Sequence, residues 1–121
     1  MICIVEGDES VSRGLLRLIE SAGLEATVCD CVEKLLSHAE HGEANCALLD
    51  LSGQDLREPA LRSRLRALSA TLPLIALSAR DDEITRRLAR EVGARAFFRK
   101  PVDAAALLDS IGWLAEPDHP H

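Results

Sequence analysis

Short apolar runs alternate with longer segments of helical periodicity from one end of this sequence to the other. The helical segments carry apolar residues at every third or fourth position, and glycine or proline marks several of their ends. Strands that alternate with helices form a parallel sheet, because each parallel connection needs a crossover about as long as a helix. The predicted fold class is therefore α/β, a doubly wound parallel sheet of five strands flanked by five helices. The expected strands are 2–5, 24–29, 46–49, 74–77 and 94–98.

The starts of the expected helices carry residues suited to capping. Asp8 or Ser10 caps the first helix and Asp81 or Asp82 caps the fourth, since short polar side chains accept hydrogen bonds from free backbone amides. Pro59 fits the first turn of the third helix, because backbone amides in the first turn have no acceptor within the helix and the missing amide hydrogen of proline costs no hydrogen bond there. The apolar positions expected to face the core from the fourth helix are Ile84, Leu88 and Val92.

Length and composition narrow the class of protein. The 121 residues suffice for one domain, and 47% hydrophobic with 28% charged residues is typical of a globular chain. The formal net charge of −6 argues against direct binding to nucleic acid. No apolar run is long enough for a membrane span, and Glu6 and Asp8 interrupt the apolar start, which argues against a signal peptide. We therefore expect a cytoplasmic domain with no membrane contact.

Four cysteines occur, at positions 3, 29, 31 and 46. Three of them lie in or beside strand-like apolar runs, where cysteine behaves as a small buried hydrophobic residue, so free thiols are expected. Cys29 and Cys31 with His38 and His41 are residue types that can bind zinc, but their spacing does not match a zinc finger or ribbon. The structural role is the favoured interpretation.

Polar residues follow four of the five expected strands: Glu6, Asp50, Ser78 and Lys100. The carboxyl ends of parallel strands meet at one rim of the sheet, where ligands bind in open α/β folds. A carboxylate can attack phosphorus directly, and the charge that develops needs a cation and fixed donors. Lys100 and Ser78 supply these groups, and Mg²⁺ held by carboxylates and water would supply the rest. The rim is therefore a candidate site for phosphoryl transfer.

Four stretches in this order resemble the receiver domain of two-component response regulators, of the CheY-like and, more closely, the FixJ type. They are 5–11, which contains the acidic turn, 48–51 around Asp50, 74–79 ending on Ser78-Ala79, and 97–101, which ends on Lys100-Pro101. The resemblance implies a flavodoxin-like sheet of strand order 2-1-3-4-5. The resemblance predicts that residues 1–115 form the receiver domain and that residues 116–121 form a polar C-terminal tail.

The resemblance also implies roles for single residues. Asp50 would be the phosphoacceptor, assisted by Lys100 and by the hydroxyl of Ser78. Phe97 would be the aromatic switch that moves together with Ser78, and the Lys100–Pro101 peptide is commonly cis in this family. The implied Mg²⁺ ligands are Glu6, Asp50 and the backbone carbonyl of Ser52.

Two departures from the family pattern concern the metal. Gly7 stands where the family has a second acidic residue that binds Mg²⁺, and the loop 52–56 replaces the usual Met-Pro-Gly loop. The sequence therefore predicts a weak, atypical or absent metal site. Two interpretations of Glu6 stay open, as a metal ligand and as the ion-pair partner of Lys100. Two functions stay open as well: a phosphoacceptor, and a phosphate-independent pseudo-receiver that only binds other proteins.

The resemblance implies signalling partners and no enzyme activity beyond self-phosphorylation and dephosphorylation at Asp50. A histidine kinase or phosphotransfer protein would supply the phosphoryl group. The face formed by the fourth helix, fifth strand and fifth helix would bind a second receiver or an output domain. The arginines of this region are interpreted mainly as a solvated face balanced by acids, and Trp113 either anchors an interface or covers the core. An unrelated nucleotide-binding enzyme of similar fold would need a glycine-rich loop after the first strand, and only Gly7 lies there.

Overall fold

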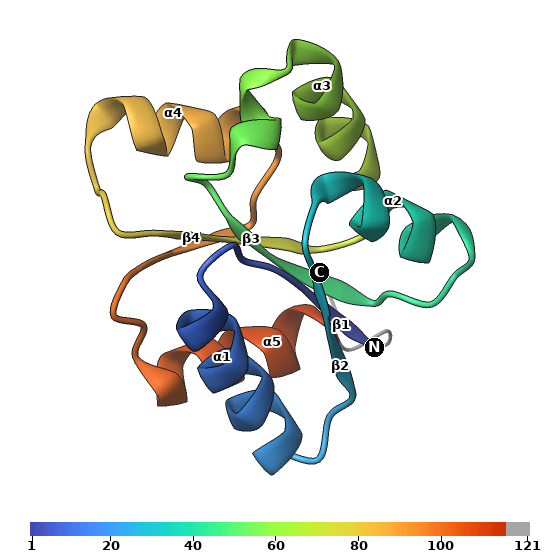
Figure 1. The fold of residues 1–121 in the computed structure, drawn as a ribbon, viewed down its shortest axis with the longest axis vertical. Coiled ribbons are helices and arrows are strands. Elements are labelled where there is room, and N and C mark those ends of the chain that lie inside the picture. The colour runs from blue at the N-terminus through green and yellow to red at the C-terminus, as the bar shows by residue number, and fades with distance from the viewer. Residues whose placement is uncertain (116–121) are drawn as a thin grey trace.

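The computed structural model describes residues 1–115 and contains five strands, five α-helices and one short 3₁₀ helix, η1 (Figure 1). The strands are β1 (Ile2–Val5), β2 (Ala26–Cys29), β3 (Cys46–Asp50), β4 (Leu74–Ser78) and β5 (Ala96–Arg99). The helices are α1 (Glu9–Ser21), α2 (Val32–Glu40), η1 (Gln54–Arg57), α3 (Pro59–Leu68), α4 (Glu83–Glu91) and α5 (Ala104–Leu114). The predicted polar tail, 116–121, lies outside the described residues, and the division of the chain at residue 115 stays a prediction.

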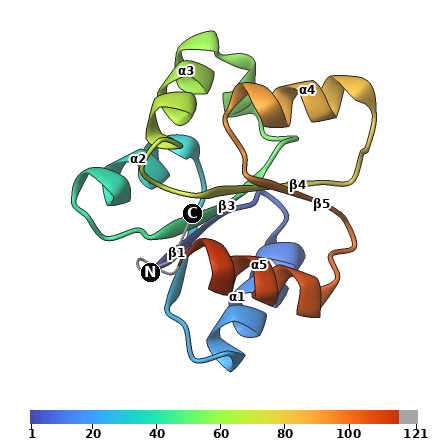
Figure 2. The same ribbon diagram turned by 180° about the vertical axis from the view of Figure 1, so that it is seen from behind.

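All strands of the sheet are parallel and follow the order β2-β1-β3-β4-β5. Helices α1 and α5 cover one face, and α2, α3 and α4 cover the other, as the two opposite views show (Figures 1 and 2). The predicted fold class and strand order are confirmed. None of the helices in residues 1–115 is both long and apolar enough to cross a membrane.

Side chains alternate across the sheet and divide the core into two layers. Ile2 and Ile4 of β1 pack in the layer under α1 and α5, while Cys3 and Val5 pack in the layer under α2, α3 and α4. Both faces are covered, so the central strands are apolar at nearly every position. Strand β2 lies at the edge of the sheet, and Val28 there is 40% exposed.

Three helices, α1, α4 and α5, are capped by the aspartate directly before their first residue. Asp8 accepts a hydrogen bond from the backbone amide of Val11, at 3.1 Å, and Asp82 accepts one from that of Thr85, at 2.8 Å. Of the alternatives left open by the sequence, Asp8 and Asp82 are therefore the caps. Asp103 caps α5 in the same way. These carboxylates satisfy amides that have no partner within the first turn of a helix.

The expectation that Ile84 faces the core is wrong, because its side chain is 75% exposed. The buried stripe of α4 instead contains Ala89 and Val92, with Leu88 partly buried beside them. Successive residues of an α-helix are about 100° apart, which places Ile84 roughly 90° from the centre of that stripe. Residues spaced by four are not aligned along a helix, since each step of four turns about 40° past a full turn. Ile84 is two such steps from Val92 and therefore lies at the side of the buried stripe.

Glycine is required at the end of α4. Gly93 has φ +81°, a backbone conformation that disfavours residues with a side chain. A Cβ atom at this position would also lie 2.1 Å from Oγ of Ser69, after the end of α3. Gly93 therefore both ends α4 and allows the close approach of two helix ends. Gly23, with the same φ of +81° after α1, has open space around it.

Candidate functional site

The four polar residues predicted to share a rim do so. Glu6 follows β1, Asp50 ends β3, Ser78 ends β4 and Lys100 follows β5. Asp50 is the register partner of Leu77, so Ser78 lies one residue farther toward the rim on the neighbouring strand. The backbone amide of Lys100 donates to the carbonyl of Ser78, at 2.8 Å, which fixes the turn after β5 beside β4. The Lys100–Pro101 peptide is cis, as the resemblance implied.

Lys100 joins the two acids of the rim. Its Nζ lies 2.6 Å from Oε2 of Glu6 and 3.3 Å from Oδ1 of Asp50. The side chains of Glu6, Asp50 and Lys100 are 1%, 8% and 18% exposed, so this three-residue cluster is shielded from water. Burial by itself lowers the pKa of Lys100, but the contacts with Glu6 and Asp50 outweigh it, and the pKa of Lys100 is raised above its ordinary value. The ammonium group therefore stays charged at neutral pH.

Asp50 is further held by the residue two positions after it. The backbone amide of Ser52 donates to Oδ1, at 3.2 Å, and its hydroxyl donates to Oδ2, at 2.8 Å. The sequence predicted a role for the carbonyl of Ser52, not for its hydroxyl. An aspartate followed two residues later by serine is a common turn pattern, and this signal could have indicated the contact. Both oxygens of Asp50 thus have donors.

The acidic turn after β1 directs only one carboxylate into the rim. Oε1 of Glu6 accepts a hydrogen bond from the backbone amide of Asp8, at 3.1 Å, and Oε2 faces Lys100. The contact of Oε2 with Lys100 is an ion pair. Asp8 itself is exposed and caps α1, and Gly7 is exposed between them. Of the two interpretations of Glu6, the structure contains the ion pair.

The residues at the rim do not fit a Mg²⁺ site as they stand. Mg²⁺ requires near-octahedral oxygen ligands, usually from more than one carboxylate together with water. All four carboxylate oxygens of Glu6 and Asp50 face donors of the protein, and the Lys100 ammonium lies between the two groups. Within residues 1–115 no group of three or more acidic, histidine or cysteine side chains could hold a metal ion. The ligand set implied by the resemblance stays a prediction, and the geometry argues against it.

A hollow of about 220 Å³ opens beside Asp50, between the ends of β1 and β3 and the start of α2. Its lining includes Glu6, Gly7, Asp50 and Asp55. Asp55, in η1, accepts a hydrogen bond from the backbone amide of Val32, at 2.8 Å, and so caps α2 from a distant part of the chain. Nothing local marks this contact, because the residues are 23 positions apart. The hollow therefore provides open space beside the carboxylate of Asp50.

Ser78 is buried and lies at the rim, but its hydroxyl faces the following turn. Its Oγ accepts a hydrogen bond from the backbone amide of Arg80, at 3.0 Å. The side chain therefore stabilises the β4–α4 turn in this structure. The contact with a phosphoryl group that the resemblance implies for Ser78 stays a prediction.

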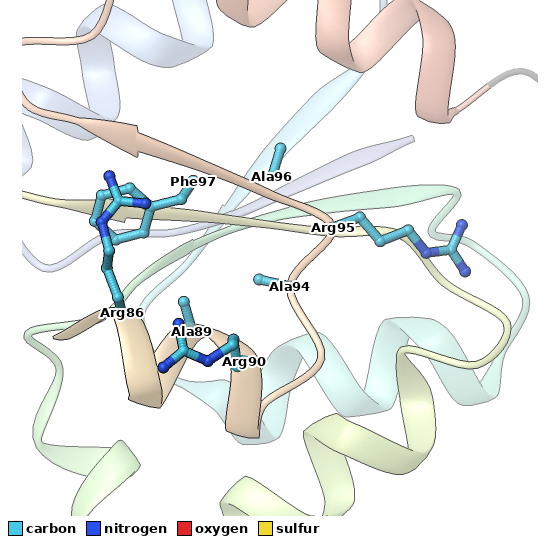
Figure 3. Close-up of a pocket in the computed structure, with 7 residues that line it drawn as sticks. All are labelled: Arg86, Ala89, Arg90, Ala94, Arg95, Ala96 and Phe97. Carbon is cyan, nitrogen blue, oxygen red and sulfur yellow. The ribbon is translucent and has the colours of Figure 1, made fainter. Parts of the chain in front are cut away.

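Phe97 lines a groove of about 170 Å³ between α4 and β5 (Figure 3). Its ring is half-buried, and the guanidinium carbon of Arg86 lies 4.9 Å from the ring centre, within the range of a cation–π contact. Asp81 holds the same guanidinium through an ion pair. Arg86 lies beside the ring in the close-up, whereas Arg95 points away from it (Figure 3). The predicted switch residue is thus covered by an arginine from α4.

Three of the arginines on and beside α4, Arg80, Arg86 and Arg90, pair with acids. Arg80 pairs with Asp82 at 2.7 Å, and Arg90 lies 3.4 Å from Glu83. These pairs are exposed and contribute little to stability. Trp113, on α5, is 60% exposed.

The sheet order and the lysine–aspartate pair at its rim define a signalling domain of flavodoxin-like fold. The chain belongs to the response regulator receiver domain family, whose model matches residues 2–112. It is therefore a receiver domain of two-component signal transduction, and the predicted family is confirmed. The finer likeness to the FixJ type stays a prediction.

Curated relatives support the same family. The sensory transduction protein RegX3 of Mycolicibacterium smegmatis is 34% identical over 110 residues, which cover 91% of this chain and 48% of RegX3. The sensory/regulatory protein RpfC of Xanthomonas campestris is 31% identical over 120 residues, covering 95% of this chain and 16% of RpfC. The chain thus spans about half the length of RegX3 and a smaller part of RpfC.

Solved structures share the fold. A response regulator receiver protein from Burkholderia phymatum superimposes with a TM-score of 0.73 at 25% identity, covering 99% of this chain and 98% of its own. A putative response regulator from Chloroflexus aurantiacus gives a TM-score of 0.81 at 23% identity, covering 94% and 95%. The second likeness concerns the fold alone.

Proposed function

We propose that Asp50 accepts a phosphoryl group from a histidine kinase or a phosphotransfer protein in the cytoplasm. The observation that carries the proposal is the pairing of the buried Asp50 with the partly buried Lys100, 3.3 Å apart, beside a hollow that borders Asp50. A nucleophilic carboxylate needs a neighbouring cation as charge develops on the phosphoryl oxygens, and Lys100 supplies one.

The reaction transfers the phosphoryl group without a net redox change. An oxygen of Asp50 forms a bond to phosphorus while the bond from phosphorus to the donor imidazole nitrogen breaks. The electron pair stays on that nitrogen, which takes a proton from solvent. Lys100 stabilises the phosphoryl oxygens, and the hydroxyl of Ser78 donates to one of them after turning from Arg80. The Ser52 hydroxyl releases the attacking oxygen when its hydrogen bond to Oδ2 breaks.

The proposed output is a change of the face formed by α4, β5 and α5. Rotation of Ser78 loosens the turn that leads into α4, and Phe97 lies on the strand beside that turn. Movement of the Phe97 ring would break its stacking with Arg86. Phosphorylation would thus shift the domain between two pre-existing states of this face, which binds a second receiver or an output domain.

A second candidate function is a phosphate-independent pseudo-receiver that binds other proteins constitutively. The observation that favours it is the ion pair of Glu6 with Lys100, which is shorter than the contact of Lys100 with Asp50. A phosphoryl group on Asp50 would compete with Glu6 for the same ammonium. Glu6 would then be a buried carboxylate without a cation, which is unfavourable.

Intact-mass analysis after incubation with acetyl phosphate, with and without Mg²⁺, tests the proposal. We expect the wild type to gain one phosphoryl group and release acetate, and Asp50→Asn to gain none. Asp30→Asn is the matched control, since Asp30 lines the same hollow on the exposed side, and it should be labelled like the wild type. No gain under either condition, while an active receiver in the same tube is labelled, would favour the pseudo-receiver. Equal labelling of Asp50→Asn would show that another residue is the acceptor.

A further inference from the structure

We propose that this domain operates without a divalent cation, because Glu6 positions the Lys100 ammonium between the two rim carboxylates and Gly7 withholds the ligand a metal would need. The inference deepens the proposed function, since it concerns the same rim. Its first part, the absence of metal binding, does not depend on whether Asp50 is phosphorylated.

Glu6 is a positioning residue in this proposal. Its carboxylate is oriented from one side by the backbone amide of Asp8 and holds Lys100 on the other, with Nζ 2.6 Å from Oε2. The ammonium in turn reaches Oδ1 of Asp50. A single positive charge of the protein thus lies between two carboxylates, leaving the three groups with a net charge of −1. A divalent cation would have to displace this ammonium and leave it without a partner in a shielded place.

No other carboxylate of the acidic turn can replace the missing ligand. Asp8 is exposed and is committed to the backbone amide of Val11, at the start of α1. Turning it into the rim would remove the cap of that helix. Among the carboxylates that line the hollow, those of Glu6 and Asp50 contact Lys100, and that of Asp55 accepts a hydrogen bond from the backbone amide of Val32.

Gly7 is the position where one residue could change this balance. It lines the hollow together with Glu6 and Asp50, and a Cβ atom built there would meet no other atom within 4 Å. Its φ is not among the positive values of the chain, so a residue with a side chain is accommodated without strain. An aspartate at position 7 would change the net charge of the cluster from −1 to −2, which one divalent cation neutralises. The space for a metal ligand exists, and only the carboxylate is missing.

Calorimetric titration with MgCl₂ tests the first part. We expect no saturable binding by the wild type or by Gly7→Ala, and saturable binding by Gly7→Asp at least about tenfold tighter than any seen in the wild type, a factor that corresponds to about 1.4 kcal/mol. Adding Asp50→Asn to Gly7→Asp should abolish the binding. Saturable binding by the wild type that is lost in Glu6→Gln would overturn the proposal, because Glu6 would then be a metal ligand. A folded Gly7→Asp that binds no Mg²⁺ would overturn the role of Gly7.

The positioning role of Glu6 has its own readout. The sequence contains two lysines, Lys34 and Lys100, so ¹³C-dimethylated side chains give two lysine resonances that can be titrated by NMR. Glu6→Gln should lower the pKa of Lys100 and leave that of Lys34 unchanged, since Lys34 pairs with Asp30 at the exposed start of α2. An unchanged pKa of Lys100 in a folded Glu6→Gln protein would contradict the positioning role.

Phosphoryl labelling separates this inference from the proposed function. We expect the labelling rate of the wild type to be the same in EDTA and in MgCl₂, and that of Gly7→Asp to rise in MgCl₂. Wild-type labelling that requires Mg²⁺ would overturn the inference and leave the proposed function intact. Absence of labelling in every variant, together with the expected pattern of Mg²⁺ binding, would refute the proposed function and support the metal-free rim.

Discussion

Replacing Lys100 tests the electrostatics of the rim most directly. Lys100→Met keeps an unbranched side chain and removes the charge that lies 2.6 Å from Glu6 and 3.3 Å from Asp50. Two shielded carboxylates would then face one another without a cation, and removal of one partner of a buried ion pair typically costs about 3–5 kcal/mol. Lys100 is 18% exposed, so we expect the lower end of this range, about 3 kcal/mol.

A double-mutant cycle assigns this loss to the ion pair. Glu6→Gln combined with Lys100→Met removes both charges of the shorter contact, so the double variant should lose less stability than the sum of the single changes, with a coupling of about 1–3 kcal/mol. Urea unfolding at pH 7, followed by circular dichroism, measures each free energy of unfolding. High salt should alter the result little, because shielded pairs are weakly screened.

The matched control is Lys34→Met, which removes the other lysine from an exposed pair with Asp30 and should change the unfolding midpoint little. Two results would refute the reasoning. One is a Lys100→Met protein as stable as the wild type, and the other is a cycle in which the two changes add without coupling.

Three further predictions concern the scaffold. Leu65→Ala, at a fully buried site of α3, should lower the free energy of unfolding by about 2–5 kcal/mol, whereas the exposed Ile84→Ala should stay within about 0.5 kcal/mol in the same urea titration. Gly93→Ala should destabilise more than Gly23→Ala, since both positions have φ +81° but only Gly93 would also clash with a neighbouring helix end; equal thermal midpoints would argue against the clash. Hydrogen bonds from the first turn of α4 lower the pKa of Asp82 to about 2, below its ordinary value of 3.8. The stability that this cap adds is therefore present above pH 3.8 and is lost as the pH falls to about 2. In urea titrations, the difference in the free energy of unfolding between the wild type and Asp82→Ala should decrease between pH 3.8 and about 2 and stay constant at higher pH.

The functional proposals differ in what they require of the rim. Phosphorylation requires that Lys100 turn from Glu6 toward the new phosphoryl oxygens, whereas a pseudo-receiver keeps the ion pair as it stands. The ion pair of Glu6 with Lys100 therefore determines which of the two functions is favoured. Glu6→Gln weakens the competition for Lys100, and comparing its labelling rate by acetyl phosphate with that of the wild type measures this balance.

Much of the fold follows from the sequence alone. Alternating apolar runs and helical periods specify five parallel strands and five helices, because the two periodicities differ and each buried face needs a partner layer. The position of the rim residues follows too, since parallel strands all end at the same edge of the sheet. For this reason Asp50, Ser78 and Lys100 could be placed together before any contact was known.

The tertiary structure decided which partner each side chain has. Whether Glu6 pairs with Lys100 depends on the direction of a long, flexible lysine side chain that reaches across the sheet. The periodicity of the sequence contains no information on the direction of that side chain. The cap that Asp55 provides for α2 joins residues distant in sequence, and the exposure of Ile84 depends on how far α4 is rotated against the sheet. A sequence specifies patterns that repeat along the chain, whereas single polar contacts across the chain depend on distances of a few ångströms that only the packed fold sets.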